Sequence, residues 1–406
     1  MSLKKLVTQT FEEKFGEPPA FVVRAPGRVN LIGEHTDYND GFVMPMAINR
    51  AVWLALRPRA DGMVCVRSLE MEDPAEFEIA NLGDPGEGWS EYLKGVTWAL
   101  LEDGYELSGF EGVMSSDVPV GAGLSSSAAL EMATAMAYMA LSDTAWDAGR
   151  MAKAGQRAEN EWMGANTGIM DQMISASGVA DHALMIDCRD LSTQLVPLPD
   201  KTLIVVLDTM TRHTHTDSGY NDRRRECEEA AAHYGVSHLR DLDKVALQKG
   251  VEGLSKKVLR RAIHVVTENE RVLQANKAMT NGDSHLMGLF MNASHDSLRD
   301  NFEVTNRDLD LMAALAQETK GCFGARMTGG GFGGCVVALV REDLAEKFAT
   351  EVAQDYQEVT GLEPHIYICQ ATDGASIAYG CSQKIANQKG ILKMKVGRFN
   401  EFKLDN

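Results

Sequence analysis

The pattern of apolar and polar positions divides this chain into short strands followed by longer helices. In the first half, apolar runs rich in Val and Leu alternate with turns that contain Gly or Pro, as in a sheet. The strands predicted here are 21–24, 52–56, 63–66 and 113–118. Residues 128–141 are dense in Ala, Met and Leu and almost free of β-branched residues, which predicts a helix. A second helix is predicted over 147–162.

Helical patterns dominate the second half. A buried strand is predicted at 203–207, and two later strands, 335–340 and 365–369, flank a helix at 341–359. The other predicted helices are 219–234, 256–279, 283–298 and 306–318. Because both halves mix helices and strands, we expect an α+β protein with two domains, 1–202 and 203–377. Residues 378–406, in which Lys and Arg outnumber acidic residues, are expected to form a separate basic tail.

The composition is that of a globular protein. Its 406 residues suit two or three domains, with 44% hydrophobic and 24% charged residues. The formal net charge of -18 argues against non-specific binding to nucleic acid or anionic membranes. It still allows an anionic nucleotide, because backbone amides and Mg²⁺ can dominate the field at one site.

Neither the N-terminus nor the cysteines indicate export. Residues 1–15 are amphipathic and charged, which predicts a surface helix and not a signal peptide. No apolar run is long enough to span a membrane. The cysteines are scattered and form no Cys-x-x-Cys pair, so we expect reduced thiols in a cytoplasmic protein.

The most unusual segment is 27–38, where charged residues interrupt an otherwise apolar stretch. A buried strand would not contain Arg28, Glu34, His35 and Asp37 unless these side chains were paired or faced something polar. We expect a strand entering a turn whose side chains converge on a ligand. Their acceptors and the switchable donor of the histidine suit a polyhydroxylated molecule such as a sugar.

A Gly- and Ser-rich run at 121–127 comes directly before the predicted helix at 128–141. Glycines let the backbone approach an anion, and a helix N-terminus offers unpaired N–H groups at the positive end of its dipole. Ser125, Ser126 and Ser127 add hydroxyls for phosphate and Mg²⁺. The alternative is a small-residue turn in which Ser127 only caps the helix. The run is not a Walker A loop, because no Lys follows its last glycine.

A second glycine-rich stretch, 327–335, matches GxGxxG through Gly329, Gly331 and Gly334. A dinucleotide fingerprint lies between a strand and a helix, whereas a strand follows this stretch, so the Rossmann interpretation fails. The alternatives are close packing of two elements or a loop beside phosphates or sugar, and we favour the loop.

Asp171 lies among small and apolar residues, where a carboxylate is costly unless paired or used. It is either a helix cap or ion-pair partner, or a functional group. Glu159, farther upstream, is a candidate for reaching a metal ion. His213 and His215 lack a carboxylate or Cys pattern at metal spacing, so we interpret them as surface or hydrogen-bonding residues.

Together these motifs resemble galactokinases of the GHMP small-molecule kinase superfamily. The segments 27–38, 118–129, 168–172 and 327–335 occur in the family's order, and the likeness covers residues 11–376. It implies two α+β domains, the N-terminal one with a left-handed crossover and the C-terminal one with a ferredoxin-like core, and an active site between them. It also implies ATP- and Mg²⁺-dependent phosphorylation of α-D-galactose at the anomeric hydroxyl, the first committed step of galactose use.

The resemblance further implies a role for individual residues. Asp171 matches the catalytic aspartate, which either accepts the hydroxyl proton or orients the hydroxyl, and Arg28 matches the arginine near the transferred phosphoryl group. The positions that match sugar-binding residues are Glu34, His35, Asp37 and Tyr220. Those that match ATP-binding residues are Ser68, Gly121, Ala122, Gly123, Leu124, Ser125, Ser126 and Ser127. The implied Mg²⁺ ligands are Ser127 and Glu159.

Two other functions stay open. A related sugar kinase would act on N-acetylgalactosamine, arabinose or galacturonate, and a non-catalytic galactose sensor would lack residues of the phosphate loop. Because 121–129 is intact and Arg28 and Asp171 are both present, we favour the enzyme. Its expected partners are galactose and ATP, with no nucleic acid or membrane, and we expect a monomer.

Overall fold

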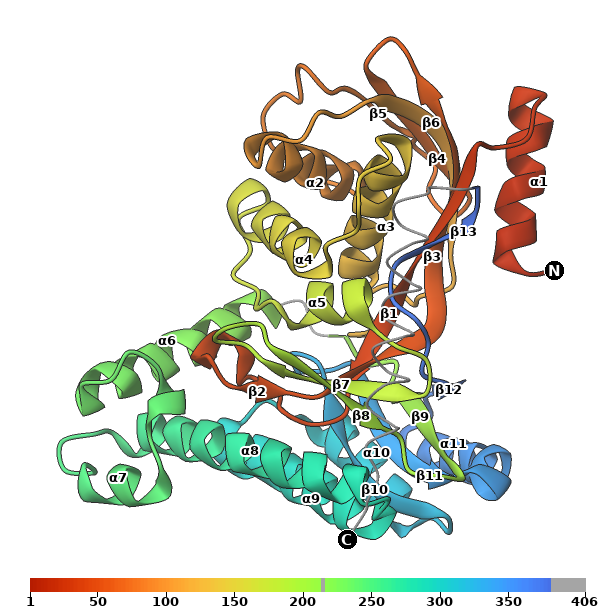
Figure 1. Cartoon of the computed structure of the whole chain (residues 1–406). Helices are drawn as coiled ribbons and strands as arrows, with labels where there is room; N and C mark the ends of the chain where they lie inside the picture. The colour runs from red at the N-terminus through yellow and green to blue at the C-terminus, as the bar shows by residue number, and fades with distance from the viewer. Residues whose placement is uncertain (213–215, 381–406) are drawn as a thin grey trace, which may run out of the picture.

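The computed structural model describes residues 1–212 and 216–380, without the side chains of 216–218. These residues form two lobes, drawn one above the other in Figure 1, with a small sheet between them. Most of the predicted basic tail, residues 381–406, lies outside the described residues.

A six-stranded sheet forms the upper lobe, with the strand order β13-β1-β3-β6-β4-β5. Its strands are β1 (Phe21–Asn30), β3 (Pro45–Arg59), β4 (Met63–Ser68), β5 (Ala75–Glu78), β6 (Gly109–Ser116) and β13 (Ser376–Tyr379). The pair β4–β6 is parallel and the other pairs are antiparallel.

Helices cover both faces of this sheet (Figure 1). They are α1 (Leu3–Phe15), α2 (Ser90–Glu102), α3 (Ser126–Leu141), α4 (Ala148–Arg157) and α5 (Met170–Ser177). Helix α1 packs on the outer face through Val7 and Phe11, which form a small core with Val22 of β1. Helices α2 to α5 bury the other face in the main core of the lobe.

The lower lobe contains a four-stranded antiparallel sheet in the order β10-β11-β9-β12. Its strands are β9 (Thr202–Asp208), β10 (Cys322–Thr328), β11 (Cys335–Arg341) and β12 (His365–Cys369). Numbered along the chain, this order reads 2-3-1-4, and with its interleaved helices it is the ferredoxin-like arrangement. A separate three-stranded sheet between the lobes contains β2 (Phe42–Val43), β7 (His182–Asp187) and β8 (Thr193–Pro197).

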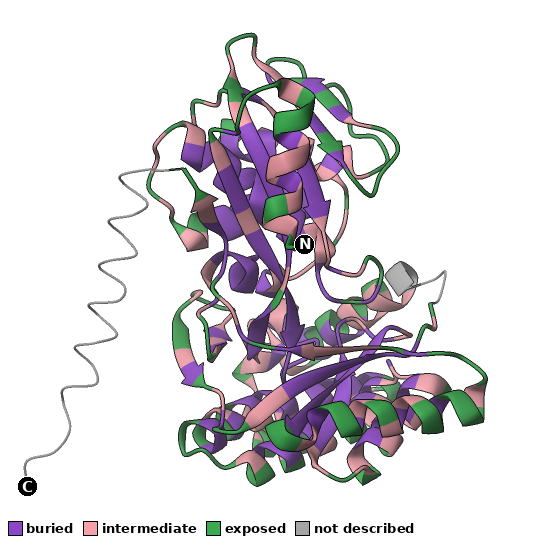
Figure 2. Cartoon of the chain, turned by 90° about the vertical axis from the view of Figure 1, so that its right-hand side faces the viewer, coloured by how far each residue is buried: buried purple, intermediate pink, exposed green. Residues whose placement is uncertain are grey.

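The helices of the lower lobe contact its sheet or pack against neighbouring helices (Figure 1). They are α6 (Thr216–Tyr234), α7 (Lys244–Lys249), α8 (Lys256–Thr280), α9 (Ser284–Ser297), α10 (Arg307–Glu318) and α11 (Ala345–Thr360). Alternate residues of β9 face opposite sides, as a strand requires: Val205 and Leu207 join the helices of the lower lobe, whereas Ile204 and Val206 join the core of the upper lobe. Figure 2 shows the buried strands of both sheets between helices with exposed outer faces.

The predicted two-domain α+β fold is confirmed, with local differences. The helix predicted over 147–162 is α4 followed by a π-helical segment, Ala158–Trp162, and the strand predicted to end at residue 118 ends at Ser116. Residues 378 and 379, assigned to the tail, belong to β13, which pairs with β1. The division at 202/203 stays a prediction, although β9 begins at Thr202.

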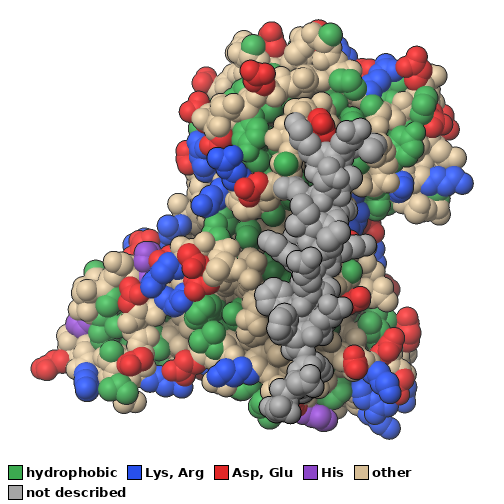
Figure 3. All heavy atoms as spheres, in the orientation of Figure 1, with side chains coloured by type: hydrophobic (Ala, Val, Ile, Leu, Met, Phe, Trp, Pro, Cys, Tyr) green, Lys and Arg blue, Asp and Glu red, His purple; other side chains and the backbone are tan. Residues whose placement is uncertain are grey.

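The surface gives no sign of a membrane segment. In the part of the chain that the structure describes, no helix is long and apolar enough to cross a bilayer. The face of the molecule in Figure 3 has acidic and basic side chains interspersed over both lobes. Exposed ion pairs of the described surface include Arg189–Asp241 and Arg341–Asp343.

Candidate active site

A cavity of about 540 Å³ brings together residues from both lobes. Seven of the predicted site residues line it: Arg28, Glu34, His35, Asp37, Glu159, Asp171 and Tyr220. The remaining lining residues are Tyr92, Met163, Gly164, Ala165, Asn166, Thr167, Gly168, Met170, Asn221, Gly329 and Gly330. The predicted ATP-binding residues, Ser68 and 121–127, do not line this cavity.

The Gly- and Ser-rich run 121–127, called the phosphate loop from here on, lies directly against the end of β1. The Arg28 amide donates to Leu124 O at 3.1 Å, and the Arg28 guanidinium donates through Nη1 to Gly123 O at 2.5 Å. Gly27 has no side chain in the way, since a Cβ there would lie 2.6 Å from Leu124 O. The segment 27–38, called the sugar segment from here on, is therefore fixed to the phosphate loop by contacts with the loop backbone.

Arg28 and Asp171 form a bidentate ion pair at this junction. Arg28 donates through Nε and Nη2 to the two carboxylate oxygens of Asp171, each at 2.7 Å. Ser125 of the phosphate loop donates a hydroxyl hydrogen bond to the same carboxylate. Arg28 is almost fully buried, whereas the Asp171 side chain is 29% exposed, so it can still reach a substrate in the cavity.

The N-terminus of α3 is left uncapped by side chains. The helix begins at Ser126, and Ser125, at the cap position with φ 58°, makes no side-chain cap hydrogen bond because its hydroxyl binds Asp171. Ser127 lies in the first turn of the helix and is not its cap. The free N–H groups of this turn are therefore available to an anion.

Glu34 is held by four donors that come mainly from the second glycine-rich stretch and its neighbourhood. Gly329 N and Thr328 Oγ1 lie 2.7 and 3.1 Å from Oε1, and Arg326 Nη1 lies 2.9 Å from Oε2, which also accepts from Asn30. Burial raises the pKa of Glu34, against the opposing charge of Arg326. Arg326 is completely buried in β10, a strand that the sequence did not reveal.

His35 is fixed as a neutral ring. A carbonyl can only accept, so Nε2 donates to Gly330 O at 3.2 Å, and Nδ1 accepts from the Tyr38 hydroxyl at 2.9 Å. Burial lowers the pKa of His35 to about 3. Its ring also packs against Tyr220, with centroids 5.4 Å apart. His35 therefore shapes the cavity wall with both ring nitrogens already occupied.

Asp37 depends on the absence of a side chain at Gly168. A Cβ at Gly168 would lie 1.8 Å from Asp37 Oδ2. Burial, and then the charge of Asp171, raise the pKa of Asp37 to about 6. Burial also raises the pKa of Tyr220 well above its ordinary value, so its hydroxyl stays a neutral donor. Asp37 and Tyr220 thus offer an acceptor and a donor to one ligand.

Glu159 lies in the π-helical segment after α4 and is 8% exposed. Thr167 Oγ1 and Gln172 Nε2 both donate to its Oε2, at 2.8 and 3.1 Å. Gln172 also donates to Glu131, one turn into α3, and burial with the charge of Glu159 raises the pKa of Glu131 well above its usual range.

The donor set around Glu159 fits Mg²⁺ held jointly with a nucleotide. Among the described residues, no three His, Cys, Asp or Glu side chains gather in a metal-binding arrangement. Mg²⁺ in kinases is typically bound by one or two carboxylates, waters and substrate phosphates and not by a cage of protein ligands. Carboxylate and hydroxyl oxygens such as those of Glu159 and Ser127 suit that mode of binding.

Among the residues interpreted from the sequence, Ser68 and the described cysteines do not line the cavity. The Ser68 hydroxyl is buried and closes the turn after β4, accepting from the amides of Glu70 and Met71. His213 and His215 lie outside the described residues. The described cysteines are all unpaired thiols.

The second glycine-rich stretch, 327–335, borders the cavity. Gly329 and Gly330 line the cavity, and Cys335 Sγ lies 3.0 Å from Ala122 O of the phosphate loop. The lining residues Asn166, Thr167 and Asn221 were not anticipated, because polar residues in loops and on exposed helix turns give no signal in one sequence.

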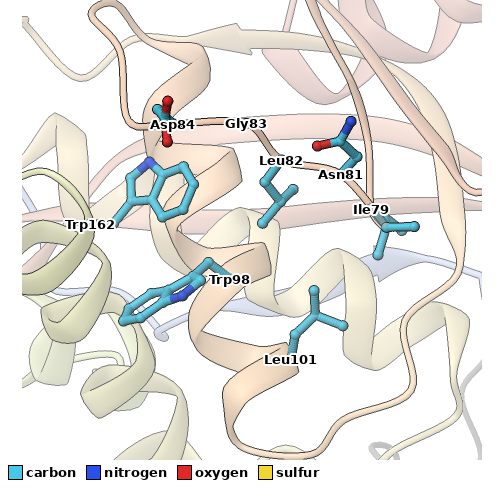
Figure 4. A pocket seen from close by; sticks show the side chains of 9 residues that line it. Ile79, Asn81, Leu82, Gly83, Asp84, Trp98, Leu101 and Trp162 are labelled. Carbon is cyan, nitrogen blue, oxygen red and sulfur yellow. The ribbon is translucent and has the colours of Figure 1, made fainter.

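A second cavity, of about 490 Å³, lies beside the C-terminal half of α2, which contributes Trp98 and Leu101 (Figure 4). Trp98 and Trp162 stand at one side of it, with ring centroids 6.1 Å apart, and residues 79–84 run along its rim. None of the predicted site residues lines it. The cavity between the lobes is therefore the candidate active site.

Comparison with known proteins matches this chain to one family. A model described as the galactokinase galactose-binding signature matches residues 9–58, and models of the GHMP kinase N-terminal and C-terminal domains match residues 91–179 and 275–358. A galactokinase of Roseiflexus sp. (strain RS-1) is 45% identical over 371 residues, which are 90% of this chain and 95% of the relative. The chain belongs to the galactokinase family.

Solved structures agree with the galactokinase assignment. Lactococcus lactis galactokinase, in a crystal structure with galactose, superposes with a TM-score of 0.88 at 35% identity, over 92% of this chain and 100% of that one. Methanococcus jannaschii mevalonate kinase shares the fold with a TM-score of 0.65 at 17% identity, over 87% of this chain and 99% of its own. The predicted family, its GHMP fold and its kinase class are confirmed.

Proposed function

We propose that this chain transfers the γ-phosphoryl group of ATP to the anomeric hydroxyl of α-D-galactose. One observation supports this above all: the Arg28–Asp171 pair lies where the sugar segment, the phosphate loop and the cavity meet. A single ion pair thus borders the places expected for both substrates. The match of residues 9–58 to a galactose-binding signature favours galactose as the sugar.

Phosphoryl transfer needs positioning and charge stabilisation more than covalent participation by the protein. We assign Asp171 to the attacking hydroxyl, as proton acceptor or as the group that orients it. Arg28 keeps the carboxylate in place through two hydrogen bonds and adds positive charge beside the transferred group. Ser125 ties the same carboxylate to the phosphate loop, so the acceptor side and donor side move together.

The charge of the cavity favours a neutral sugar over galacturonate. Among the described residues that line it, Arg28 is the single Lys or Arg, and its charge is already paired with the carboxylate of Asp171. A uronate would add a fifth carboxylate beside Glu34, Asp37, Glu159 and Asp171, and the one cation among the described lining residues is already paired with Asp171. We assign the sugar contacts to Asp37, Tyr220, Glu34 and the wall formed by His35.

We assign ATP to Ser68 and the loop 121–127, and Mg²⁺ to Ser127 and Glu159. Bound there, Mg²⁺ would neutralise phosphate charge during transfer. The chain's own part is to hold the Glu159 carboxylate, which Thr167 and Gln172 do from the same side. We further propose a monomer in the cytoplasm, as expected from the sequence.

The decisive assay couples ADP release to a sugar panel with and without Mg²⁺. The panel contains galactose, glucose, N-acetylgalactosamine, arabinose and galacturonate. We expect magnesium-dependent ADP release with galactose well above the other sugars. Sugar-independent or absent ADP release would support the non-catalytic sensor, and a preference for another member of the panel would replace galactose.

Asp171→Asn tests the assigned acceptor. We expect turnover to fall by ~10²–10⁴-fold, the range for loss of acid–base assistance, with ATP affinity retained. Calorimetric titration with ATP and a thermal melt check binding and folding, and Asp200→Asn at an exposed turn serves as the matched control. Near-normal turnover in folded Asp171→Asn would refute the role.

A further inference from the structure

A cation of the lower lobe faces the open start of the phosphate loop. Arg212 follows β9, and a Cβ placed at Gly121 would lie 3.8 Å from Arg212 Nε. Gly121 is exposed and has φ 72°, so this side of the loop is accessible from solvent. The guanidinium thus borders the segment that we assign to the ATP phosphates.

The backbone that precedes Arg212 is held firmly against the second glycine-rich stretch. Thr209 donates to Gly334 O through both its amide, at 3.0 Å, and its hydroxyl, at 2.7 Å, and Gly334 N donates to Thr211 O at 3.1 Å. A Cβ at Gly333 would lie 2.7 Å from Thr211 O. Because Cys335 in turn contacts Ala122 O, the position of Arg212 relative to the phosphate loop is fixed by packing.

Arg212 leaves Nε of its guanidinium unused within the described protein, while Nη1 donates to Thr211 O at 3.2 Å as well as to Asp208. Nη1 and Nη2 donate to the Asp208 carboxylate at 2.8 and 2.6 Å, and Asp208 is buried. The Arg212 side chain is 39% exposed, and Nε donates to no acceptor among the residues that the structure describes. Its unused N–H therefore lies on the edge nearest Gly121.

A triphosphate in this position needs positive charge that the loop does not supply. The run 121–127 contains no Lys or Arg, and the charge of Arg28, beside the transferred group, is paired with Asp171. An arginine with a free N–H beside a glycine-rich loop is a well-suited donor to phosphate oxygens. We propose that Arg212 binds the phosphate chain of ATP through Nε and the adjacent N–H, with Asp208 holding it in place.

This proposal rests on the proposed kinase function and adds a substrate-binding residue from the lower lobe. Its competitor is a purely structural Arg212 that only balances the buried charge of Asp208. The two differ in what Asp208→Asn does. If Arg212 binds phosphate, Asp208→Asn leaves the cation beside the loop and should weaken MgATP binding less than loss of the arginine in Arg212→Met. If Arg212 is only structural, Asp208→Asn and Arg212→Met should affect MgATP binding equally.

The experiment is calorimetric titration of the full chain with MgATP, MgADP and adenosine. For Arg212→Met we expect the Kd of MgATP and MgADP to rise about 10- to 100-fold, as for a lost hydrogen bond to a charged group, with adenosine unchanged. The KM for galactose should stay within about twofold, and Arg212→Lys should recover part of the affinity. Asp208→Asn removes a positioning group but keeps the cation, so it should weaken MgATP binding clearly less than Arg212→Met does.

Two further variants separate binding from stability. Asp208→Asn/Arg212→Met removes both partners of the ion pair, so it should fold better than Arg212→Met and still bind MgATP weakly. Arg341 forms a two-bond ion pair with Asp343 at the end of β11 that lies away from Asp208. Arg341→Met should therefore bind MgATP like the parent. Since these titrations contain no sugar, failure of galactose turnover in the parent would affect only the proposed reaction.

Parent-like MgATP affinity in folded Arg212→Met would overturn the proposal. So would an equal loss for adenosine and MgATP, or a loss in Asp208→Asn as large as in Arg212→Met.

Discussion

At the scale of single residues, the site combines groups whose chemistry is altered by burial. Asp37 is the clearest example, because its carboxylate lies beside Asp171 with Gly168 packed against it. A charged Asp37 is useful for accepting a sugar hydroxyl and unfavourable for the folded state. Function and stability therefore oppose each other at this position.

The pH dependence of that opposition can be tested with Asp37→Asn. The folded-state pKa of Asp37, about 6, lies above the ordinary value of 3.8, so the folded protein loses stability as the pH rises through this interval. Removing the charge should raise stability by about 1–3 kcal/mol at pH 8, with a smaller gain at pH 5. Thermal melts of both proteins at the two pH values measure this.

The same carboxylate should control sugar use. In the parent we expect kcat/KM for galactose to fall below pH 6 as Asp37 takes up a proton. Asp37→Asn should show weaker galactose binding and lose this acidic limb. A variant that is less stable at pH 8 and keeps the parental pH profile would contradict both roles.

At the scale of elements, the site depends on loops in contact through their backbones. Strand β1 and the phosphate loop meet at Gly27, where Leu124 O and a Val118 methyl fill the space of a missing side chain. The 327–335 stretch closes on the same loop from the other side. Positions on these loops should therefore tolerate little added volume.

Gly27→Ala tests this contact. Its Cβ would lie 2.6 Å from Leu124 O, and a backbone atom can move only if the phosphate loop shifts. We expect a stability loss of about 1–3 kcal/mol and a higher KM for ATP. Denaturant unfolding and steady-state kinetics measure the two effects.

Gly149→Ala is the control for this substitution. Gly149 lies in α4, where an added Cβ meets only ordinary contacts, so the change should leave kinetics alone and stabilise the helix by up to about 1 kcal/mol. Equal behaviour of the two alanine variants would mean that the close approach at Gly27 has no functional weight.

Sequence patterns predicted the elements with strong periodicity and missed those defined by distant partners. The helices α3 and α8 were predicted nearly to their ends, because propensity and amphipathic spacing act within one segment. Strand β10 was not predicted, since Arg326 and Thr328 interrupt its apolar pattern. Those two residues are buried against Glu34, a contact across the two lobes that no local pattern can encode.

The candidate site was predictable to the extent that its residues are chemically unusual. Arg28, Glu34, Asp37 and Asp171 stood out as charges in apolar surroundings, and the structure gathers them in one cavity. Arg212 did not stand out, because an arginine in a polar segment is ordinary. Its position beside Gly121 is a product of tertiary packing.

At the scale of the whole molecule, the two lobes share a hydrophobic core. The core of the upper lobe includes residues of the lower-lobe elements α8, α9, β9, β11 and β12. The last strand described, β13, lies far from β1 in the sequence and pairs with it in the sheet of the upper lobe. The boundary between the lobes is therefore a continuous buried interface. Such an interface should couple their unfolding.

We expect the chain to unfold in one cooperative transition. Differential scanning calorimetry at neutral pH should show a single peak, shifted as a whole to higher temperature by MgATP or by galactose. Two resolved transitions, of which only one responds to galactose, would show that the lobes are energetically independent.

Strand β13 also sets the order of events when the protein is made. Strand β1 emerges from the ribosome long before its edge partner, 376–379. Until then the strand that leads into Arg28 exposes unpaired N–H and C=O groups on that edge. The sugar segment is thus translated well before the strand that completes the sheet behind it.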